Sequence, residues 1–279
     1  MPLTLISPRT TRTTRTTRTS HATHATRLTR WLANTLAGLC VAALPVLASA
    51  QQLTISAAAS LTEAFKEIGS QFEASKPGLS LRLNFAASGT LLQQISQGAP
   101  VDVFASADQA TVDRGIAQKL FDPASRRDFA SNSVVLIVPG QGAVAALRSL
   151  ADLASAEVKR IAVGKVATVP VGHYTQEALD KAKLWSPLEP KFVYADTVRQ
   201  VLDYVARGEV DAGFVYRTDA LVAGDKVKTL LTVPGHTPVS YPVVLVSDSR
   251  NKAASQDFIA YLASPPAQAV LAKYGFGKP

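Results

Sequence analysis

The sequence is poor in cysteine and histidine, with one cysteine and four histidines in 279 residues. Cys40 lies in an apolar N-terminal stretch, so the chain beyond residue 50 contains no cysteine and no disulfide. A chain of this length buries a core that needs no disulfide, which is compatible with an oxidising compartment. Only His173 and His236 follow residue 50, and they lack the spacing of a metal-ligand pair. This shortage disfavours a transition-metal site.

The shortage of histidine also disfavours a serine hydrolase, the main rival from another functional class. A serine nucleophile needs a general base nearby, and the sequence has no Gly-x-Ser-x-Gly motif. His173 lies close to a predicted helix start, where a histidine is usually exposed to solvent. We therefore expect no enzymatic activity, no catalytic residue and no cofactor.

Acidic residues are absent from the first 50 positions, which contain six arginines. A mostly apolar stretch runs from Trp31 to Leu47, and Ala48-Ser49-Ala50 fits a small-residue cleavage site. This plan is that of a secretory signal peptide, so residues 1–50 are expected to be removed and the mature protein to be periplasmic. An uncleaved anchor is the less favoured alternative. Leu39 precedes Cys40, where a lipoprotein signal needs a small residue.

Net charge is nearly absent once this segment is removed. The whole chain carries +8, and loss of the six arginines leaves 23 basic and 21 acidic residues, a net charge of +2. Such a balance predicts no polyanionic partner, and no nucleic acid is expected. The Thr/Arg-rich segment 9–30 has a rival interpretation as a nucleic-acid arm, which export would remove. No later apolar run is long enough to span a bilayer.

Strand and helix patterns alternate from residue 51 to the C-terminus, which predicts an α/β fold with mainly parallel sheets. About 229 residues suffice for one large or two small domains. Apolar strands at 134–138 and 243–247 are expected to cross between two lobes. These lobes are predicted to be residues 51–133 plus 241–279 and residues 134–240.

Four strand-to-helix junctions recur along the chain, each with a hydroxyl residue or a proline at the helix entry. They precede the predicted helices 64–72, 91–95, 175–183 and 198–207. Helix N-termini present unpaired N–H groups and the positive end of a dipole. Ligands of α/β sheets bind outside the carboxyl ends of the strands, where these junctions lie. The junctions are therefore candidates for binding an anion.

The groups that the junctions offer are neutral hydrogen-bond donors, without lysine or arginine in a junction core. They are the hydroxyls of Ser60, Ser88 and Tyr216 and the backbone N–H groups near Val171 and Val198. Tyr216 is expected at the end of a strand, 211–216. A site made of donors suits a fully deprotonated oxyanion.

Each candidate residue also has a purely structural interpretation. Ser60 and Glu63 have the spacing of a capping box. Ser88 and Thr197 can cap helices, the two valines can pack in the core, and Tyr216 can be an ordinary core tyrosine. For each residue alone, the structural interpretation is favoured. When all of them occur together on an exported chain, the interpretation as a binding site becomes stronger.

Seven motifs follow one another in a fixed order from residue 53 to the C-terminus: Ala57–Thr62, Phe85–Leu91, Gly98–Asp108, Asn132–Leu136, Val169–Gly172, Gly213–Tyr216 and Lys273–Phe276. With these motifs the chain resembles the periplasmic molybdate-binding proteins of ABC transporters, which are bacterial extracellular solute-binding proteins. The resemblance implies the two-lobed periplasmic-binding-protein fold of type II. In that fold two three-layer α/β lobes are joined by crossing strands, and the ligand lies in the cleft.

The resemblance further implies high-affinity binding of molybdate or tungstate and delivery to the membrane permease of an ABC importer, by a monomer. The family holds its ligand through two serine hydroxyls, two backbone N–H groups and one tyrosine hydroxyl. By motif these fall on Ser60, Ser88, Val171, Val198 and Tyr216, and molybdenum would be bound only as the oxyanion, through these same residues. Relatives commonly carry a smaller residue at 171, and some carry Ser at Gly89. Another tetrahedral oxyanion, such as sulfate, is the alternative ligand.

Overall fold

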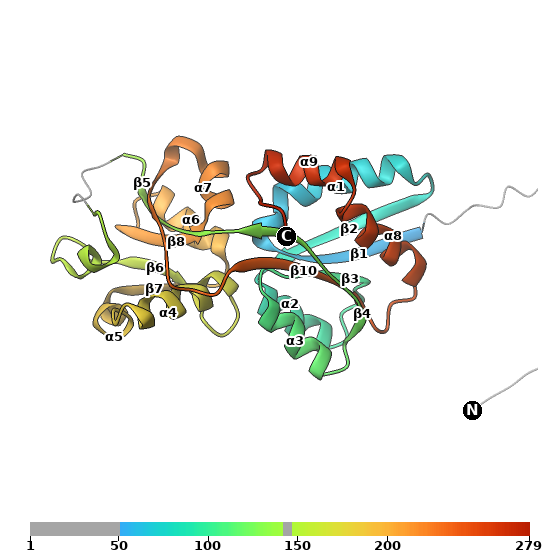
Figure 1. Ribbon diagram of the computed structural model, residues 1–279, viewed down its shortest axis with the longest axis horizontal. Helices are drawn as coiled ribbons and strands as arrows, with labels where there is room; N and C mark the ends of the chain where they lie inside the picture. The colour runs from blue at the N-terminus through green and yellow to red at the C-terminus, as the bar shows by residue number, and fades with distance from the viewer. Residues whose placement is uncertain (1–50, 142–146) are drawn as a thin grey trace, which may run out of the picture. The chain divides into compact units, whose positions relative to one another are not determined.

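The computed structural model describes residues 51–141 and 147–279, so the predicted signal peptide lies outside the part of the chain considered below. This part forms two five-stranded sheets with helices packed against them (Figure 1). A continuous cluster of buried apolar side chains extends through both sheets, from Leu53 to Phe276. No helix in the described ranges is long and apolar enough to cross a membrane.

The first sheet has the strand order β2-β1-β3-β10-β4. Its strands are β1 (Gln51–Ala58), β2 (Leu79–Ala86), β3 (Val103–Ala105), β4 (Phe121–Asn132) and β10 (Val239–Val246). The helical segments of this part are η1 (Ala59–Leu61), α1 (Thr62–Ser75), α2 (Ser88–Ser96), α3 (Gln109–Ala117), α8 (Lys252–Leu262) and α9 (Pro265–Lys273). Strand β1 pairs in parallel with β2 and β3, whereas β10 is antiparallel to β3 and β4.

The second sheet has the order β7-β6-β8-β5-β9 and repeats this arrangement. Its strands are β5 (Val134–Pro139), β6 (Ile161–Gly164), β7 (Phe192–Ala195), β8 (Ala212–Tyr216) and β9 (Val227–Thr232). Its helical segments are η2 (Leu150–Ala154), α4 (Pro170–Lys181), α5 (Trp185–Leu188), η3 (Glu189–Lys191), α6 (Val198–Ala206), α7 (Arg217–Ala223) and η4 (Gly224–Lys226). Strand β6 is parallel to β7 and β8, and β5 is antiparallel to β8 and β9.

The expectation of mainly parallel sheets is therefore correct only for the strands joined through helices. The chain leaves the first sheet at Ser133 and returns to it through residues 233–238, so the strands next to these passages run antiparallel to their neighbours. Strand 134–138 belongs to the second sheet, and most of 243–247 lies in β10 of the first. We propose that each sheet with its helices acts as one lobe, residues 51–133 plus 241–279 and residues 134–240.

Candidate ligand-binding site

A small cavity of about 10 Å³ lies where the carboxyl ends of strands from the first sheet face helix starts from the second. Its lining contains no charged residue and consists of Ala58, Ala59, Ser60, Ala86, Ala87, Ser88, Ala107, Val169, Pro170, Val171, Val198 and Tyr216. The structure thus brings together all five residues that the sequence singled out. Their role as ligand contacts stays a prediction.

Ser60 lies in the short turn η1, one residue before the N-cap of α1. The predicted capping box between Ser60 and Glu63 is wrong, because the N-cap is Leu61 and α1 has no side-chain cap. The turn η1 separates β1 from α1 and directs the buried Ser60 hydroxyl inward, where its Oγ lies 3.0 Å from Tyr241 Oη. The Ser60 hydroxyl is therefore not used for capping.

Ser88 is the first residue of α2 and is fully buried. It does not cap this helix, since Ala87 is the N-cap and makes no side-chain bond. Instead, Ser88 Oγ accepts a hydrogen bond from the Ala107 N–H at 3.0 Å. Because the oxygen serves as acceptor there, the hydroxyl hydrogen can be donated into the cavity.

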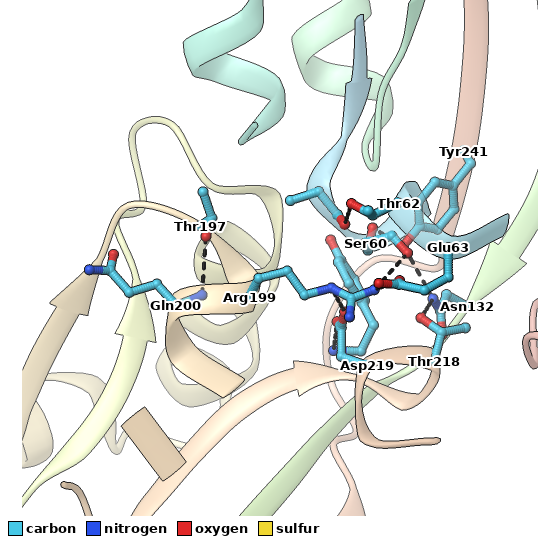
Figure 2. Close-up of polar contacts among 12 residues, drawn as sticks. Ser60, Thr62, Glu63, Asn132, Thr197, Arg199, Gln200, Thr218, Asp219 and Tyr241 are labelled. Atoms are coloured by element: carbon cyan, nitrogen blue, oxygen red, sulfur yellow. Dashed lines mark hydrogen bonds and ion pairs between the residues drawn. The ribbon is translucent and has the colours of Figure 1, made fainter. Parts of the chain in front are cut away.

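The capping interpretation holds for Thr197, whose Oγ1 accepts the Gln200 N–H at 3.1 Å (Figure 2). Val198 is consequently the first residue of α6. First-turn N–H groups have no partner within a helix and carry the positive end of its dipole. The N-terminus of α6 therefore presents such donors at the cavity.

Helix α4 begins at Pro170, five residues before the predicted start at Thr175. Its early start depends on Gly172, where an added Cβ would lie 2.0 Å from the carbonyl oxygen of Gly164 at the end of β6. This close approach brings the first turn, with Val171, to the cavity. Proline and glycine are turn signals in sequence, which is why the helix start was misplaced.

Tyr216 ends β8, as the sequence predicted, and its side chain is buried. Its Oη has no hydrogen-bond partner among the described residues. Burial raises the pKa of this phenol well above its ordinary value of 10.0, so the group keeps its hydrogen and acts as a donor. A buried hydroxyl without a partner costs free energy, on the order of 1–3 kcal/mol, which an acceptor in the cavity would recover.

An ion-pair cluster that no sequence motif indicates lies beside the cavity. Arg199 of α6 contacts Glu63 of α1, and its Nε lies 2.9 Å from Asp219 Oδ1, although the N–H is not directed at that oxygen (Figure 2). Asp219 is fully buried, and this burial raises the pKa of its carboxyl to about 6 despite the opposing effects of Arg199 and of the Tyr216 N–H. Arg199 and Glu63 are 136 positions apart, and no sequence pattern indicates an ion pair between residues at such a separation.

Gly89 lies at a close contact between the two sides of the cavity. Its N–H donates to Thr168 O at 2.9 Å, and an added Cβ would lie 2.7 Å from Thr168 Cα. A serine at this position would not fit the arrangement seen here, because its Cβ would meet the same backbone atoms. The glycine is therefore explained by space rather than by a missing hydroxyl.

The residues that suggest metal or nucleophile chemistry were also located in the described ranges. They contain no group of three or more His, Cys, Asp or Glu side chains that could hold a metal ion. His173 is not among the residues that line the cavity, and its ring faces Glu177 with Nδ1 3.6 Å from Oε1.

The two sheets, the chain passages between them and the cavity at their facing edges define a two-lobed periplasmic binding protein of type II. The family described as bacterial extracellular solute-binding protein matches residues 53–277, so the chain belongs to this family. It is a solute-binding protein rather than an enzyme, and the family's extracellular character agrees with export. Cleavage after Ala50 stays a prediction.

The chain is 38% identical over 257 residues to the molybdate-binding protein ModA of Escherichia coli (strain K12), covering 88% of this chain and 98% of that protein. The solved Azotobacter vinelandii periplasmic molybdate-binding protein is 22% identical with a TM-score of 0.70, over 81% of this chain and 99% of that one. The sulfate-binding protein SubI of Mycobacterium tuberculosis H37Rv is 17% identical with a TM-score of 0.71. This match covers 81% of this chain and 86% of that one. The two structural likenesses show the fold alone.

Proposed function

We propose that this protein binds molybdate and tungstate with high affinity in the periplasm and delivers them to the permease of an ABC importer, as a monomer. The observation that carries the proposal is the buried Tyr216 hydroxyl, which has no hydrogen-bond partner within residues 51–141 and 147–279 and lines the same uncharged cavity as two serine hydroxyls and two helix starts. The 38% sequence identity to a molybdate-binding protein, over 98% of that protein's length, supports the same ligand.

The cavity is too small for a large organic ligand, and its polarity suits an oxyanion. Its volume of about 10 Å³ is roughly the space that one buried water needs, far below the roughly 300–1,000 Å³ of pockets that hold drug-sized molecules. Ser60, Ser88 and Tyr216 would donate their hydroxyl hydrogens, and Val171 and Val198 their backbone N–H groups. Hydrogen bonds and helix dipoles would then stabilise the dianion without a cationic side chain, and molybdenum would be held only as its oxyanion.

We expect the purified mature protein to bind molybdate and tungstate about equally, sulfate far more weakly and phosphate undetectably. Tungstate matches molybdate in size and charge, whereas sulfate is smaller and would leave the donors too far from its oxygens. Phosphate carries a proton at neutral pH, and that O–H would meet only donors. Calorimetric competition titrations with the four oxyanions measure this order. Equal affinity for sulfate and molybdate would instead identify a sulfate-binding protein.

We expect Ser88→Ala to weaken molybdate binding by about ten- to a hundredfold. A hydrogen bond to a charged group contributes roughly 1.5–3 kcal/mol, and each 1.4 kcal/mol corresponds to a factor of ten in affinity. Titration calorimetry measures the change. Ser96→Ala is the matched control, because it removes an exposed hydroxyl from the other end of α2. Unchanged affinity in Ser88→Ala would place the ligand elsewhere.

A further inference from the structure

Tyr241 lies directly behind Ser60 and outside the cavity lining. It belongs to β10, its side chain is fully buried, and its Oη is 3.0 Å from Ser60 Oγ (Figure 2). Its ring packs edge-on against Tyr216 and Phe276. Either hydroxyl could be the donor in the bond between Tyr241 and Ser60, so the surroundings must decide its direction.

Asn132, at the end of β4, sets that direction. Its Oδ1 accepts the Ser133 N–H at 2.9 Å, which turns the amide nitrogen to the other side. Nδ2 then donates to Thr218 Oγ1 at 2.9 Å and to Tyr241 Oη at 3.2 Å. An amide nitrogen only donates hydrogen bonds, so Tyr241 Oη is the acceptor in this contact.

The hydrogen of Tyr241 consequently goes to Ser60 Oγ. Burial raises the pKa of Tyr241 far above that of an ordinary phenol, so this hydrogen is present throughout the working range of pH. The opposite arrangement, in which Ser60 donates to Tyr241, would leave the buried phenol hydrogen without an acceptor. With its oxygen accepting from Tyr241, Ser60 has its own hydrogen free to point into the cavity.

We propose that Asn132 and Tyr241 are specificity-determining residues, which hold Ser60 as a hydrogen-bond donor toward the ligand and thereby exclude anions that carry a proton. This inference rests on the proposed oxyanion-binding function of the cavity. Ser88 is held as a donor in the same way, by the Ala107 N–H. A protonated oxyanion would therefore find no serine oxygen ready to accept its hydrogen.

Sulfate and hydrogenphosphate provide the test, because at mildly alkaline pH both are dianions of similar size and only phosphate carries a proton. The measured quantity is the ratio of their affinities, determined by competition with molybdate. Because phosphate binding to the wild type is expected to be undetectable, the highest phosphate concentration used sets a lower limit for the wild-type ratio. In Tyr241→Phe the Ser60 oxygen is free to accept the phosphate hydrogen, so competition by phosphate is expected to become measurable. The ratio of sulfate to phosphate affinity should then lie at least tenfold below the wild-type limit. A change in packing alone would weaken both anions alike.

Asn132→Asp is the second variant and reverses the chain of hydrogen bonds. One carboxylate oxygen still accepts the Ser133 N–H, while the other can only accept the Tyr241 hydrogen. Tyr241 then accepts from Ser60, whose lone pairs turn toward the ligand, and the ratio again falls at least tenfold. The added negative charge affects both dianions equally and cancels in the ratio.

Tyr261→Phe in α8 is the control, since it removes a tyrosine hydroxyl that lies 3.4 Å from Gln71 Oε1 and outside the cavity lining. It should leave the ratio unchanged. Phosphate competition that stays undetectable in both Tyr241→Phe and Asn132→Asp, while sulfate still binds, would overturn the proposal and leave Tyr241 as a packing residue. If Tyr241→Phe does not fold, Asn132→Asp decides alone. A wild-type protein that binds none of the oxyanions would instead refute the proposed function itself.

Discussion

Gly89→Ala is expected to lower molybdate affinity by roughly a hundredfold, about 2.8 kcal/mol. The added Cβ would lie 2.7 Å from Thr168 Cα and 2.8 Å from Thr168 O. These are backbone atoms of the opposite side of the cavity, and they cannot move away as a flexible side chain can. The two sides must therefore separate, which draws Ser88 away from the donors of α4.

The same substitution should leave the unliganded protein at least as stable as the wild type. Gly89 lies in the first turn of α2, and alanine favours a helix over glycine by about 1 kcal/mol. Affinity and stability are thus expected to change in opposite directions, which a general folding defect would not produce. Titration calorimetry and thermal unfolding without ligand measure the two quantities.

Gly69→Ala is the matched control for this experiment. It makes the same change inside α1, but its Cβ would meet only the ends of the Leu81 and Leu83 side chains, at 3.2 and 3.5 Å. Small-angle scattering adds a second readout, because molybdate should reduce the radius of gyration of the wild type and not that of Gly89→Ala. Wild-type affinity in Gly89→Ala would show that the contact with Thr168 is not needed for binding.

Arg199→Met is expected to lower the free energy of unfolding by about 3–5 kcal/mol near neutral pH, since it leaves a buried charge without its partner. Asp219 is fully buried, and its Oδ1 lies 2.9 Å from Arg199 Nε. Methionine has a similar length and fills much of the same space. Urea unfolding of the two proteins at several pH values measures the loss.

The loss should become smaller as the pH falls, and the sign follows from the pKa of Asp219. Burial raises that pKa from 3.8 to about 6 in the folded wild type, and removal of Arg199 raises it further. The folded protein then binds a proton more tightly than the unfolded chain, so stability decreases as pH rises from the unfolded pKa to the folded one. Near pH 5 the carboxyl of the variant is neutral, and much of the penalty is absent.

Glu63→Gln is the control for Arg199→Met, because it removes the other carboxylate that contacts Arg199. The Glu63 side chain is 34% exposed, and partly exposed ion pairs contribute at most about 1 kcal/mol. A small effect at every pH is therefore expected. An equal loss for Arg199→Met at pH 5 and pH 8 would contradict the role given to the buried carboxyl.

The sequence alone predicted those features that depend on neighbouring residues. The order of strand-to-helix junctions, the Thr197 cap and the position of Tyr216 at the end of a strand were all confirmed. Local patterns of polarity and chain-breaking residues report backbone preference and buried faces directly. The motifs also sufficed to indicate the family, since they follow one another over nearly the whole chain.

The sequence pattern does not reveal the edge strands β4 and β9, and the reason is physical. They end their sheets in the strand orders β2-β1-β3-β10-β4 and β7-β6-β8-β5-β9. β4 contains adjacent arginines at 126 and 127, and many residues of both strands are only partly buried. Edge strands commonly carry such charged residues, so they lack the apolar runs that reveal central strands.

Only the tertiary structure decided what each polar side chain does. Ser60 and Glu63 have the spacing of a helix cap, yet Ser60 bonds to Tyr241 and Glu63 to Arg199, which are 181 and 136 positions away. Asn132 and Tyr241 meet across 109 positions because β4 and β10 are paired in one sheet. A hydroxyl forms its hydrogen bond with a group that is close in space, and the fold brings these distant residues close together. Local sequence shows only which residues are adjacent along the chain, so it could not predict these partners.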